Sequence, residues 1–298
     1  MFMKILKNRY ILLLISFLIS SYFINFNRVN ALNSSSIYSK QHPILFLHGW
    51  TGDYTNWNQM KGRFINDGWS SSELYAYTFK NTADYSSEGN IQNANELIQW
   101  VDNILNGTGA EKVDLVSHSM GGISSRYYIK FLGGLNKVDD YVCMGSPHHG
   151  VAGGTKVFNS NSTFLNSIND GDETPSGILN DTIGSRVDPI GGSTYNSTHV
   201  PGNINYTSIY STGDTICAPY ITSKLDGANN IKVEGVDHIN LIFFYNIYDL
   251  VKDAVYDDIT VSNGSGISIS GYDLLLTSSI ILLAIIIWIK TRIRIKKV

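Results

Sequence analysis

The sequence has few cysteines, and this shortage narrows the kinds of site it can hold. Only two occur among 298 residues, Cys143 and Cys217. Two cysteines cannot supply the spacing of a thiolate metal site. In an oxidising compartment they could pair, and otherwise they are two buried thiols; both alternatives stay open. No cluster of acidic residues indicates a cation site either, so the sequence implies neither a metal nor a cofactor.

Charge is also scarce, at 16% of residues against 43% hydrophobic ones, which is typical of a globular protein. The net charge of −3 hides an asymmetry, because both ends of the chain are basic. Without residues 1–31 and 272–298, the remaining chain holds 13 basic and 24 acidic residues, a balance of −11. Such a domain would repel a phosphate-rich partner, which argues against nucleic-acid binding.

The first 31 residues have the three parts of a secretory signal peptide. Lys4, Lys7 and Arg9 form a basic region, and residues 10–23 are a nearly continuous apolar run. Ala31 is a small residue at the −1 position of a possible cleavage site. We expect cleavage after Ala31, with an uncleaved signal anchor as the alternative.

A second apolar run covers residues 274–289. At 1.5 Å per residue it spans about 24 Å, short of the roughly 30 Å hydrocarbon core, and residues 267–273 supply the missing length. Trp288 would lie at an interface, and the basic residues of 290–298 would stay cytoplasmic. The sequence therefore predicts a single-pass membrane protein of the secretory pathway, with its folded domain in the lumen or outside the cell.

Two alternatives remain for this C-terminal segment. Small residues at 262–266 precede a spacer and an apolar tail, as in a lipid-anchor (GPI) signal, but this tail ends basic where such tails end apolar. A buried core helix is the other alternative. Seven N-x-S/T sequons support secretion only weakly, since roughly five are expected by chance. They begin at Asn33, Asn106, Asn161, Asn180, Asn196, Asn205 and Asn263.

Between the ends, short apolar runs alternate with longer helix-like stretches. The predicted strands are 44–47, 74–79, 113–116, 141–144, 206–210 and 231–233. The predicted helices are 56–67, 91–105, 120–132 and 239–256. This alternation indicates an α/β fold, a mainly parallel sheet with helices on both faces. Residues 146–204 break the rhythm, because they are rich in Gly, Ser, Asn and Thr with little periodicity, and a loop of that length is usually functional or mobile.

The sharpest motif is Ser117-His118-Ser119-Met120-Gly121, between a predicted strand and a predicted helix. It is close to the Gly-x-Ser-x-Gly nucleophile elbow of the α/β-hydrolase fold. In that turn the residues two before and two after the nucleophile approach closely and must be small. Ser119 is therefore the candidate nucleophile, and the Met120 amide, at a helix N-terminus, is a candidate oxyanion donor.

The predicted strand 44–47 is followed by His48, Gly49 and Trp50. In this fold the loop after that strand supplies the second oxyanion donor, which we assign to the Trp50 amide. Gly49 would let the backbone approach the substrate. His48 is expected to support this loop, not to act as the base.

The chain order of this fold is serine, then acid, then histidine. Asp214 follows a predicted strand and begins a loop, which is the usual place for the acid, and His238 is the only histidine after it. Asp188 is the reserve acid, but no clear strand precedes it, and Asp237 is too close to His238 in the chain to orient its ring.

Over most of residues 42–256, outside the 146–204 insertion, the chain resembles the small secreted Bacillus-type lipases, which are minimal α/β-hydrolases. The resemblance is carried by residues 112–122, 127–130, 206–211 and then Asp214, 225–230, and 235–239. It implies hydrolysis of triacylglycerols or other carboxylic esters, with the same Ser119, Asp214 and His238, and with oxyanion amides at Trp50 and Met120. Ser117 departs from the alanine or glycine of that family.

The long insertion is a second departure, because the minimal lipases lack a lid. It begins Gly145-Ser146-Pro147-His148-His149-Gly150, which looks like the corresponding turn in larger, lidded bacterial lipases. We expect a cap or lid, with a floppy surface insertion as the alternative. The predicted organisation is a signal peptide (1–31), a catalytic domain (32–262), a linker (263–273), a transmembrane segment (274–289) and a basic tail (290–298).

The sequence thus predicts a serine hydrolase acting on lipid esters. A thioesterase or phospholipase could use the same residues. A membrane-anchored binding protein on an inactive hydrolase scaffold is the non-enzymatic alternative, but it predicts a missing triad member, and none is missing.

Overall fold

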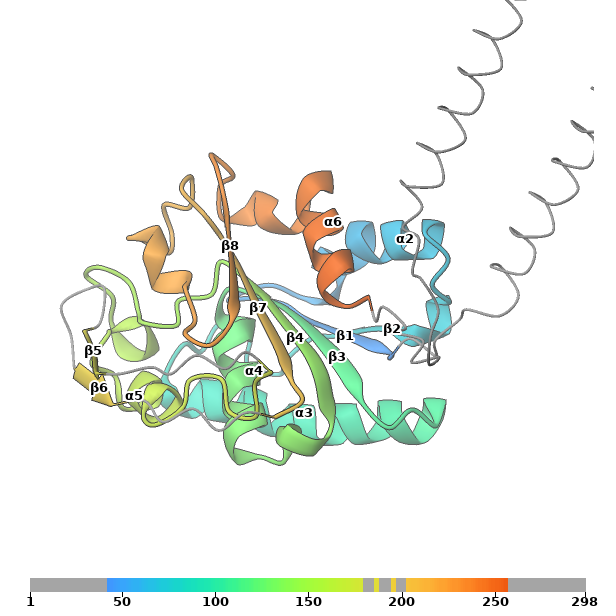
Figure 1. Ribbon diagram of the computed structural model, residues 1–298, viewed down its shortest axis with the longest axis horizontal. Coiled ribbons are helices and arrows are strands. Elements are labelled where there is room, and N and C mark those ends of the chain that lie inside the picture. The colour runs from blue at the N-terminus through green and yellow to red at the C-terminus, as the bar shows by residue number, and fades with distance from the viewer. Residues whose placement is uncertain (1–41, 179–184, 188–193, 197–201, 257–298) are drawn as a thin grey trace, which may run out of the picture. The chain divides into compact units, whose positions relative to one another are not determined.

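A six-stranded parallel sheet organises the computed structural model, which describes residues 42–178, 185–187, 194–196 and 202–256 (Figure 1). Every pair of neighbouring strands in this sheet is parallel. The predicted mainly parallel sheet is therefore confirmed. In spatial order its strands are β2 (Leu74–Tyr77), β1 (Ile44–Leu47), β3 (Val113–His118), β4 (Val138–Met144), β7 (Asn205–Ser211) and β8 (Asn229–Val233).

The central strands are the most hydrophobic segments of the described chain. β1 reads Ile-Leu-Phe-Leu, and all four of its residues are buried. Every residue of β3 is buried as well. A strand covered on both faces has no solvent side, so β1 is a continuous apolar run instead of an alternating one, while β3 also buries the polar side chains of Asp114, Ser117 and His118. At the edge, β8 carries exposed and half-buried residues.

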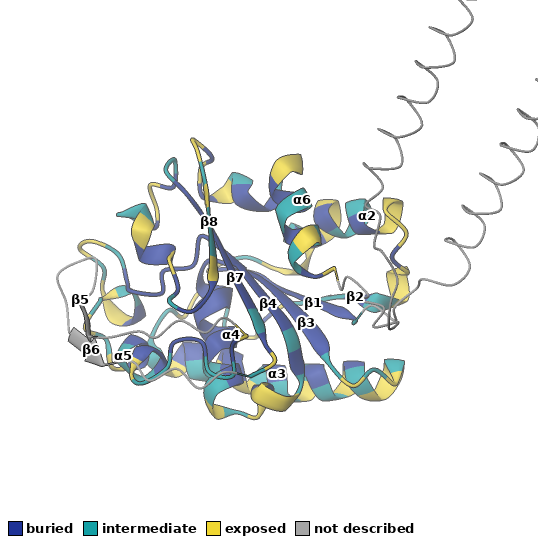
Figure 2. Ribbon diagram, viewed as in Figure 1, coloured by how far each residue is buried: buried dark blue, intermediate teal, exposed yellow. Residues whose placement is uncertain are grey.

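Helices cover both faces of the sheet (Figure 1). On one face lie α2 (Asn58–Asn66) and α6 (Tyr245–Ala254), whose Phe64 and Tyr248 pack with Phe46 of β1. On the other lie α3 (Ser87–Thr108) and α4 (Met120–Phe131), packed in a second core that contains Leu45 and Leu115. Successive residues of a strand thus point into opposite cores, and the buried interior runs along the sheet between the helix layers (Figure 2).

The last predicted helix, 239–256, is wrong as a single element. The chain forms a short 3-10 helix, η6 (Ile239–Ile242), and then α6, and Phe244 between them is extended at φ −75° and ψ 143°. Arg63 of α2 donates hydrogen bonds to the Phe243 carbonyl (2.6 Å) and the Phe244 carbonyl (3.0 Å). The guanidinium thus satisfies carbonyls that a continuous helix would have bonded internally.

The insertion contains regular structure that its composition did not predict. It holds η4 (Lys156–Phe158), α5 (Thr163–Asn169) and the antiparallel pair β5 (Ser185–Val187) and β6 (Thr194–Asn196). Ser162 caps α5 by accepting a hydrogen bond from the Leu165 amide. The apolar face of this short helix packs on α4 in a third hydrophobic cluster, made of Met120, Ile123, Val157, Phe164, Leu165 and Ile168.

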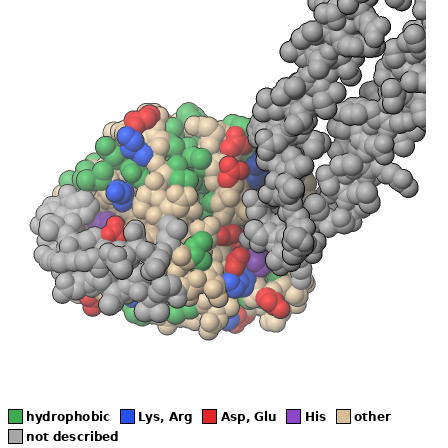
Figure 3. Space-filling model, viewed as in Figure 1, with side chains coloured by type: hydrophobic (Ala, Val, Ile, Leu, Met, Phe, Trp, Pro, Cys, Tyr) green, Lys and Arg blue, Asp and Glu red, His purple; other side chains and the backbone are tan. Residues whose placement is uncertain are grey.

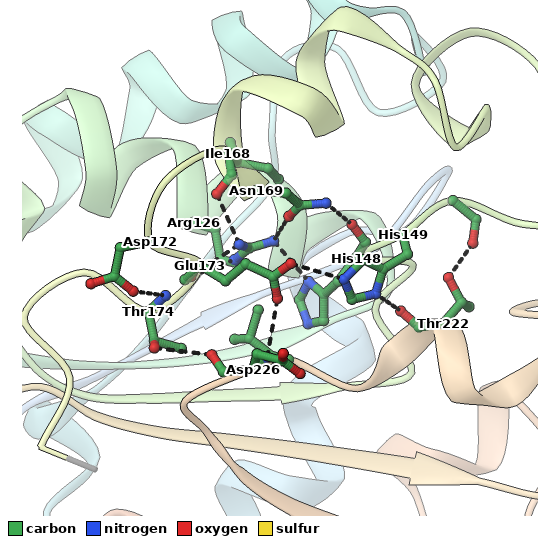
Figure 4. Close-up of polar contacts among 12 residues, drawn as sticks. Arg126, His148, His149, Ile168, Asn169, Asp172, Glu173, Thr174, Thr222 and Asp226 are labelled. Atoms are coloured by element: carbon green, nitrogen blue, oxygen red, sulfur yellow. Dashed lines mark hydrogen bonds and ion pairs between the residues drawn. The ribbon is translucent and has the colours of Figure 1, made fainter. Parts of the chain in front are cut away.

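A buried polar network, here called the anchor cluster, joins the insertion to α4; it comprises Arg126, His148, His149, Asn169 and Glu173 (Figure 4). The guanidinium of Arg126 donates to Asn169 Oδ1 (2.9 Å) and to the Glu173 carbonyl (2.9 Å). The Asn169 amide donates in turn to the His148 carbonyl (2.8 Å). All five side chains lose their water on folding, so these bonds are required for the insertion to pack here.

The same cluster reaches the chain beyond β7. His149 places Nε2 2.9 Å from Glu173 Oε1 and Nδ1 3.2 Å from the Thr222 carbonyl. Glu173 Oε2 accepts a hydrogen bond from the Asp226 amide (3.1 Å). Residues 146–178 are thereby bonded on one side to α4 and on the other to residues 222–226.

The terminal predictions fall on residues that the structure does not describe. These are the signal peptide (1–31), the linker (263–273), the transmembrane segment (274–289) and the basic tail (290–298). Among the residues that are described, no helix combines the length and the hydrophobicity that a bilayer crossing requires.

We predict that Arg126→Met, which keeps the aliphatic stem, destabilises the protein strongly. It leaves Asn169 Oδ1 and the Glu173 carbonyl without the Arg126 donor, and each buried acceptor left unpaired costs about 1–3 kcal/mol, whereas the Ile168 carbonyl keeps the Lys130 ammonium. We expect a loss of at least about 2 kcal/mol in the free energy of unfolding, measured by urea denaturation. Lys130→Met, one turn along α4, is the control, because Lys130 also donates to the Ile168 carbonyl but is only half-buried. Equal losses in the two variants would contradict a special role for the cluster.

Candidate active site

Ser119 lies in a sharp turn between β3 and α4. Its backbone is at φ 53° and ψ −127°, in a region that serine rarely adopts and that costs about 1–3 kcal/mol. The Ser119 amide donates to the Met144 carbonyl at the end of β4 (2.9 Å). The neighbouring strand thus holds the strained residue in place, at the carboxyl end of the sheet.

The small residues of the motif are explained by close backbone approaches. A Cβ on Gly121 would lie 2.5 Å from the His48 carbonyl oxygen, and one on Gly122 would lie 2.0 Å from Ser146 Oγ. Ser117 is tolerated because its buried hydroxyl donates to the Val142 carbonyl of β4 (3.1 Å). The departure from the usual first glycine therefore leaves the turn intact.

The structure brings Ser119, Asp214 and His238 together. His238 Nε2 lies 3.0 Å from Ser119 Oγ, and His238 Nδ1 lies 2.7 Å from Asp214 Oδ2. The second Asp214 oxygen accepts hydrogen bonds from the amides of Ile216 (2.9 Å) and Cys217 (2.8 Å). A carboxylate held in this way keeps Nδ1 as the donor, which leaves the Nε2 lone pair facing the serine hydroxyl.

All three side chains follow parallel strands of one sheet, β3 for Ser119, β7 for Asp214 and β8 for His238. They are at most 8% exposed. The carboxyl ends of parallel strands meet at one edge of a sheet, so residues distant along the chain converge there. The reserve acid Asp188 lies outside the described residues. Asp237 instead accepts hydrogen bonds from the amide and from the side chain of Asn240 in η6.

The two expected oxyanion residues flank Ser119. Met120 is the first residue of α4, and Trp50 lies in the turn that follows β1. A Cβ on Gly49 would lie 2.8 Å from the Ser119 Cβ, so the β1 turn passes directly beside the elbow. The Trp50 indole donates to the Ala83 carbonyl (2.8 Å), which ties this turn to the loop after β2.

His48 contacts its own loop. Its ring is buried, Nε2 accepts a hydrogen bond from the Phe79 amide (3.0 Å), and Nδ1 donates to the Gly49 carbonyl (2.8 Å). Burial lowers the pKa of the imidazole below its usual value. A neutral ring with both nitrogens engaged holds the loop in place, as the sequence led us to expect.

A cavity of about 480 Å³ opens onto Ser119. That volume is in the range of small-molecule sites. The insertion contributes Pro147, Val151 and Phe158 to its wall, and the loops that carry Asp214 and His238 contribute Ile216 and Ile239. These two isoleucines are also 61% and 56% exposed, so the apolar lining continues onto the surface.

Both cysteines are free and buried, so the alternative of a disulfide is not realised. Cys143 Sγ lies 3.1 Å from His148 Nε2. Cys217 lines the cavity and donates to the Gly145 carbonyl (3.0 Å), and burial raises the pKa of its thiol well above the usual value. A protonated, hydrogen-bonded thiol is a poor metal ligand and a poor nucleophile.

Two groups of side chains within the described residues have the spacing of metal ligands. One is Asp214, Cys217 and His238, which already form the hydrogen bonds given above. The other lies at the opposite end of the sheet and consists of His42, which precedes β1, and of Asp114 and Asp139, which are the second residues of β3 and β4. In that second group the Lys112 ammonium lies 2.5 Å from Asp139 and supplies the positive charge. On the face of the molecule in Figure 3, the visible basic side chains are few and separated.

The comparisons with known proteins point to lipases. Residues 41–153 match the family Lipase (class 2). A triacylglycerol lipase of Burkholderia plantarii is 26% identical over 163 residues, 54% of this chain and 42% of that protein. One of Pseudarthrobacter phenanthrenivorans is 27% identical over 153 residues, 51% of this chain and 44% of that protein. Over residues 41–153 the chain is therefore similar to class 2 lipases. It aligns with less than half the length of these two relatives.

Solved lipase structures share the fold of this chain. Aspergillus fumigatus lipase B gives a TM-score of 0.53 at 12% identity, covering 74% of this chain and 54% of that one. The mature form of Bacillus licheniformis lipase BlEst2 gives 0.53 at 17% identity, covering 74% and 94%. The predicted α/β-hydrolase fold is therefore confirmed, as is the resemblance to Bacillus-type lipases.

The sequence analysis did not single out Gly145, which packs behind the triad. Its φ is 55°, and a Cβ there would lie 2.9 Å from Asp214 Oδ2 and 3.2 Å from His238 Nδ1. We predict that Gly145→Ala displaces the acid–base pair and slows fluorophosphonate labelling of Ser119 by about ten- to a hundredfold.

The matched control for this prediction is Gly109→Ala. Gly109 also has a positive φ, 67°, but it ends α3 in open space. Both variants carry the backbone strain of about 1–2 kcal/mol, visible as a lower melting temperature. Only Gly145→Ala should lose labelling, and equal labelling rates for the two would contradict the steric argument.

Proposed function

We propose that the chain is a serine hydrolase that cleaves carboxylic esters of lipids through an acyl-enzyme. The observation that carries the proposal is the pair of contacts on one imidazole, with Ser119 Oγ at 3.0 Å and Asp214 Oδ2 at 2.7 Å. A hydroxyl at that distance can lose its proton to Nε2 as it attacks a carbonyl carbon. The buried carboxylate at Nδ1 fixes the tautomer in which Nε2 can accept that proton.

In the first half-reaction Ser119 Oγ bonds to the ester carbonyl carbon, and the hydroxyl proton passes to His238 Nε2. The carbonyl π electrons move onto the oxygen, which becomes negatively charged. Asp214 stabilises the imidazolium formed at that moment. The amides of Trp50 and Met120 are the proposed donors to the oxyanion, and one such donor is worth about 10²–10³ in rate.

The tetrahedral intermediate then collapses. The carbon–oxygen bond to the alcohol breaks, and the leaving oxygen takes the proton from His238 Nε2, so the alcohol departs neutral and the acyl group stays on Ser119. In the second half-reaction water loses a proton to the same nitrogen as it attacks the acyl carbon. Collapse of this second intermediate returns the proton to Ser119 Oγ and releases the carboxylic acid.

Two features support a lipid ester as the substrate. The cavity wall contributed by Pro147, Val151, Phe158, Ile216 and Ile239 is apolar, which suits an acyl chain. The relatives that match this chain are named triacylglycerol lipases. A thioesterase or phospholipase would use the same triad, and a panel of acyl-chain lengths and headgroups separates these activities.

The location of the enzyme is also a proposal. A secretory signal over residues 1–31 and a membrane segment over 274–289 would place the catalytic domain on the luminal or extracellular side of a membrane, with secretion or a lipid anchor as alternatives. Protease protection of membrane vesicles that contain the full chain tests this orientation. Digestion of the catalytic domain only after the vesicles are opened would support it.

We predict that Ser119→Ala abolishes hydrolysis of p-nitrophenyl acyl esters and labelling by a fluorophosphonate, because no other nucleophile touches His238 Nε2 in the described structure. Ser117→Ala, in the same turn, is the control and should keep most of the activity, since its hydroxyl donates to the Val142 carbonyl and is bonded to neither Asp214 nor His238 in the described contacts. Residual turnover in Ser119→Ala near the wild-type rate would refute the assignment. Wild-type protein that neither labels nor hydrolyses any ester of the panel would favour the inactive scaffold.

A further inference from the structure

His118, the residue before the nucleophile, contacts the base directly. It is the last residue of β3, its side chain is 5% exposed, and it forms part of the cavity wall. His118 Nε2 lies 2.9 Å from the backbone carbonyl oxygen of His238. A carbonyl only accepts, so Nε2 carries a proton and donates it. The two rings also pack together, with centroids 4.6 Å apart and planes at 47°.

The segment that carries His238 has limited packing of its own. Asp237 and Ile239, on either side of the base, are exposed, and η6 begins at His238 with no side-chain cap. Val236 is buried, and its amide donates to Ser211 Oγ (3.0 Å). The bond from His118 therefore restrains the backbone of His238 itself, at the point where the segment turns into the cavity.

The other end of this bond is among the most rigid parts of the protein. β3 is paired on both sides, with β1 and with β4, and His118 is in register with Met144 of β4. Ser119 follows it directly. Two adjacent residues of one chain thus bond to His238, Ser119 at the ring and His118 at the backbone. The distance between nucleophile and base is then set by one short covalent segment instead of by two independent loops.

His118 is suited to this place because it stays uncharged. Burial, and next the positive charge that His238 can carry, lower the pKa of His118 to about 3. Asp214 acts in the opposite direction, and His48 adds a small lowering. A neutral ring beside the base adds no repulsion when His238 becomes an imidazolium during the reaction.

We propose that His118 is a positioning residue, which holds His238 at proton-transfer distance from Ser119 through its hydrogen bond to the His238 backbone carbonyl. The inference rests on the proposed function, because it concerns the same triad. The nucleophile-elbow pattern leaves the residue at position 118 open, and the proposal gives His118 a positioning role that this pattern does not specify.

Two substitutions that differ by one methylene group test the proposal. In His118→Gln the amide nitrogen can reach the position of Nε2, whereas in His118→Asn the amide is too short to reach the His238 carbonyl. We expect His118→Asn to lower kcat for a p-nitrophenyl ester by about ten- to a hundredfold, with a much smaller change in KM. His118→Gln should restore most of the lost kcat. Fluorophosphonate labelling of Ser119 should follow the same order.

The outcomes separate this proposal from the proposed function. If both variants turn over and label like the wild type, or if both lose kcat equally, the positioning role is overturned while the Ser119 hydrolase stands. If the wild type itself is neither labelled nor active, both are overturned. His42→Gln, at the opposite end of the sheet, is the control for loss of a histidine and should leave kcat unchanged.

A measurement of stability gives a second readout that does not depend on activity. The folded-state pKa of His118, about 3, is below the ordinary 6.5, so the unfolded chain takes up a proton that the native protein refuses. The contribution of this residue to stability is therefore present above pH 6.5 and is lost as the pH falls toward 3. We expect the urea midpoint of His118→Gln to fall less than that of the wild type between pH 7 and pH 5. Parallel losses would contradict a neutral, buried His118.

Discussion

The positive φ of Ser119 is the constraint on which the rest of the site depends. A serine at φ 53° is strained, and the chain keeps it there because the Ser119 amide is bonded to Met144 and the flanking glycines let Leu47, His48 and Ser146 approach the turn. Relaxation of this one residue would move its hydroxyl away from His238. Strain of this kind persists only where the surroundings over-determine it, which explains why the parallel strands on both sides of β3 are among the most deeply buried in the sheet.

The ionisable side chains of the site are close together because the loops that carry them follow parallel strands of one sheet. Asp214 is almost fully buried, a costly place for a carboxylate, and it is compensated by two amides of its own loop and by the His238 ring. His48 and His118 lie close by, and burial lowers the pKa of both. His118 and His238 line the cavity, and His48 holds the turn beside it. Of these three histidines only His238 is bonded to Asp214, and that difference in partners supports the role proposed for its ring.

Much of this arrangement could be predicted from residue patterns. Ile44–Leu47 is a strand at the predicted bounds, because four consecutive apolar residues before His-Gly have few other solutions. Chain order was enough to select Asp214 and His238, the residues that meet Ser119. Phe244 was placed inside a helix, since its extended backbone depends on a guanidinium from α2, 181 residues away in the sequence. Gly145 and His118 were not recognised for the same reason, because their partners come from other strands and local spacing does not record them.

The insertion shows how composition can mislead. Its Gly, Ser, Asn and Thr content suggested a loop, yet residues 146–178 carry α5 and a buried polar network. Polar residues were counted as surface residues, whereas Asn169, Glu173 and His149 are buried because Arg126 and the backbone of residues 222–226 satisfy them. The same network fixes the position of Pro147 and Val151, so one wall of the cavity is set by hydrogen bonds behind it. Displacing this segment would leave the buried guanidinium of Arg126 without its acceptors, so the network behind the wall stabilises the segment in this position.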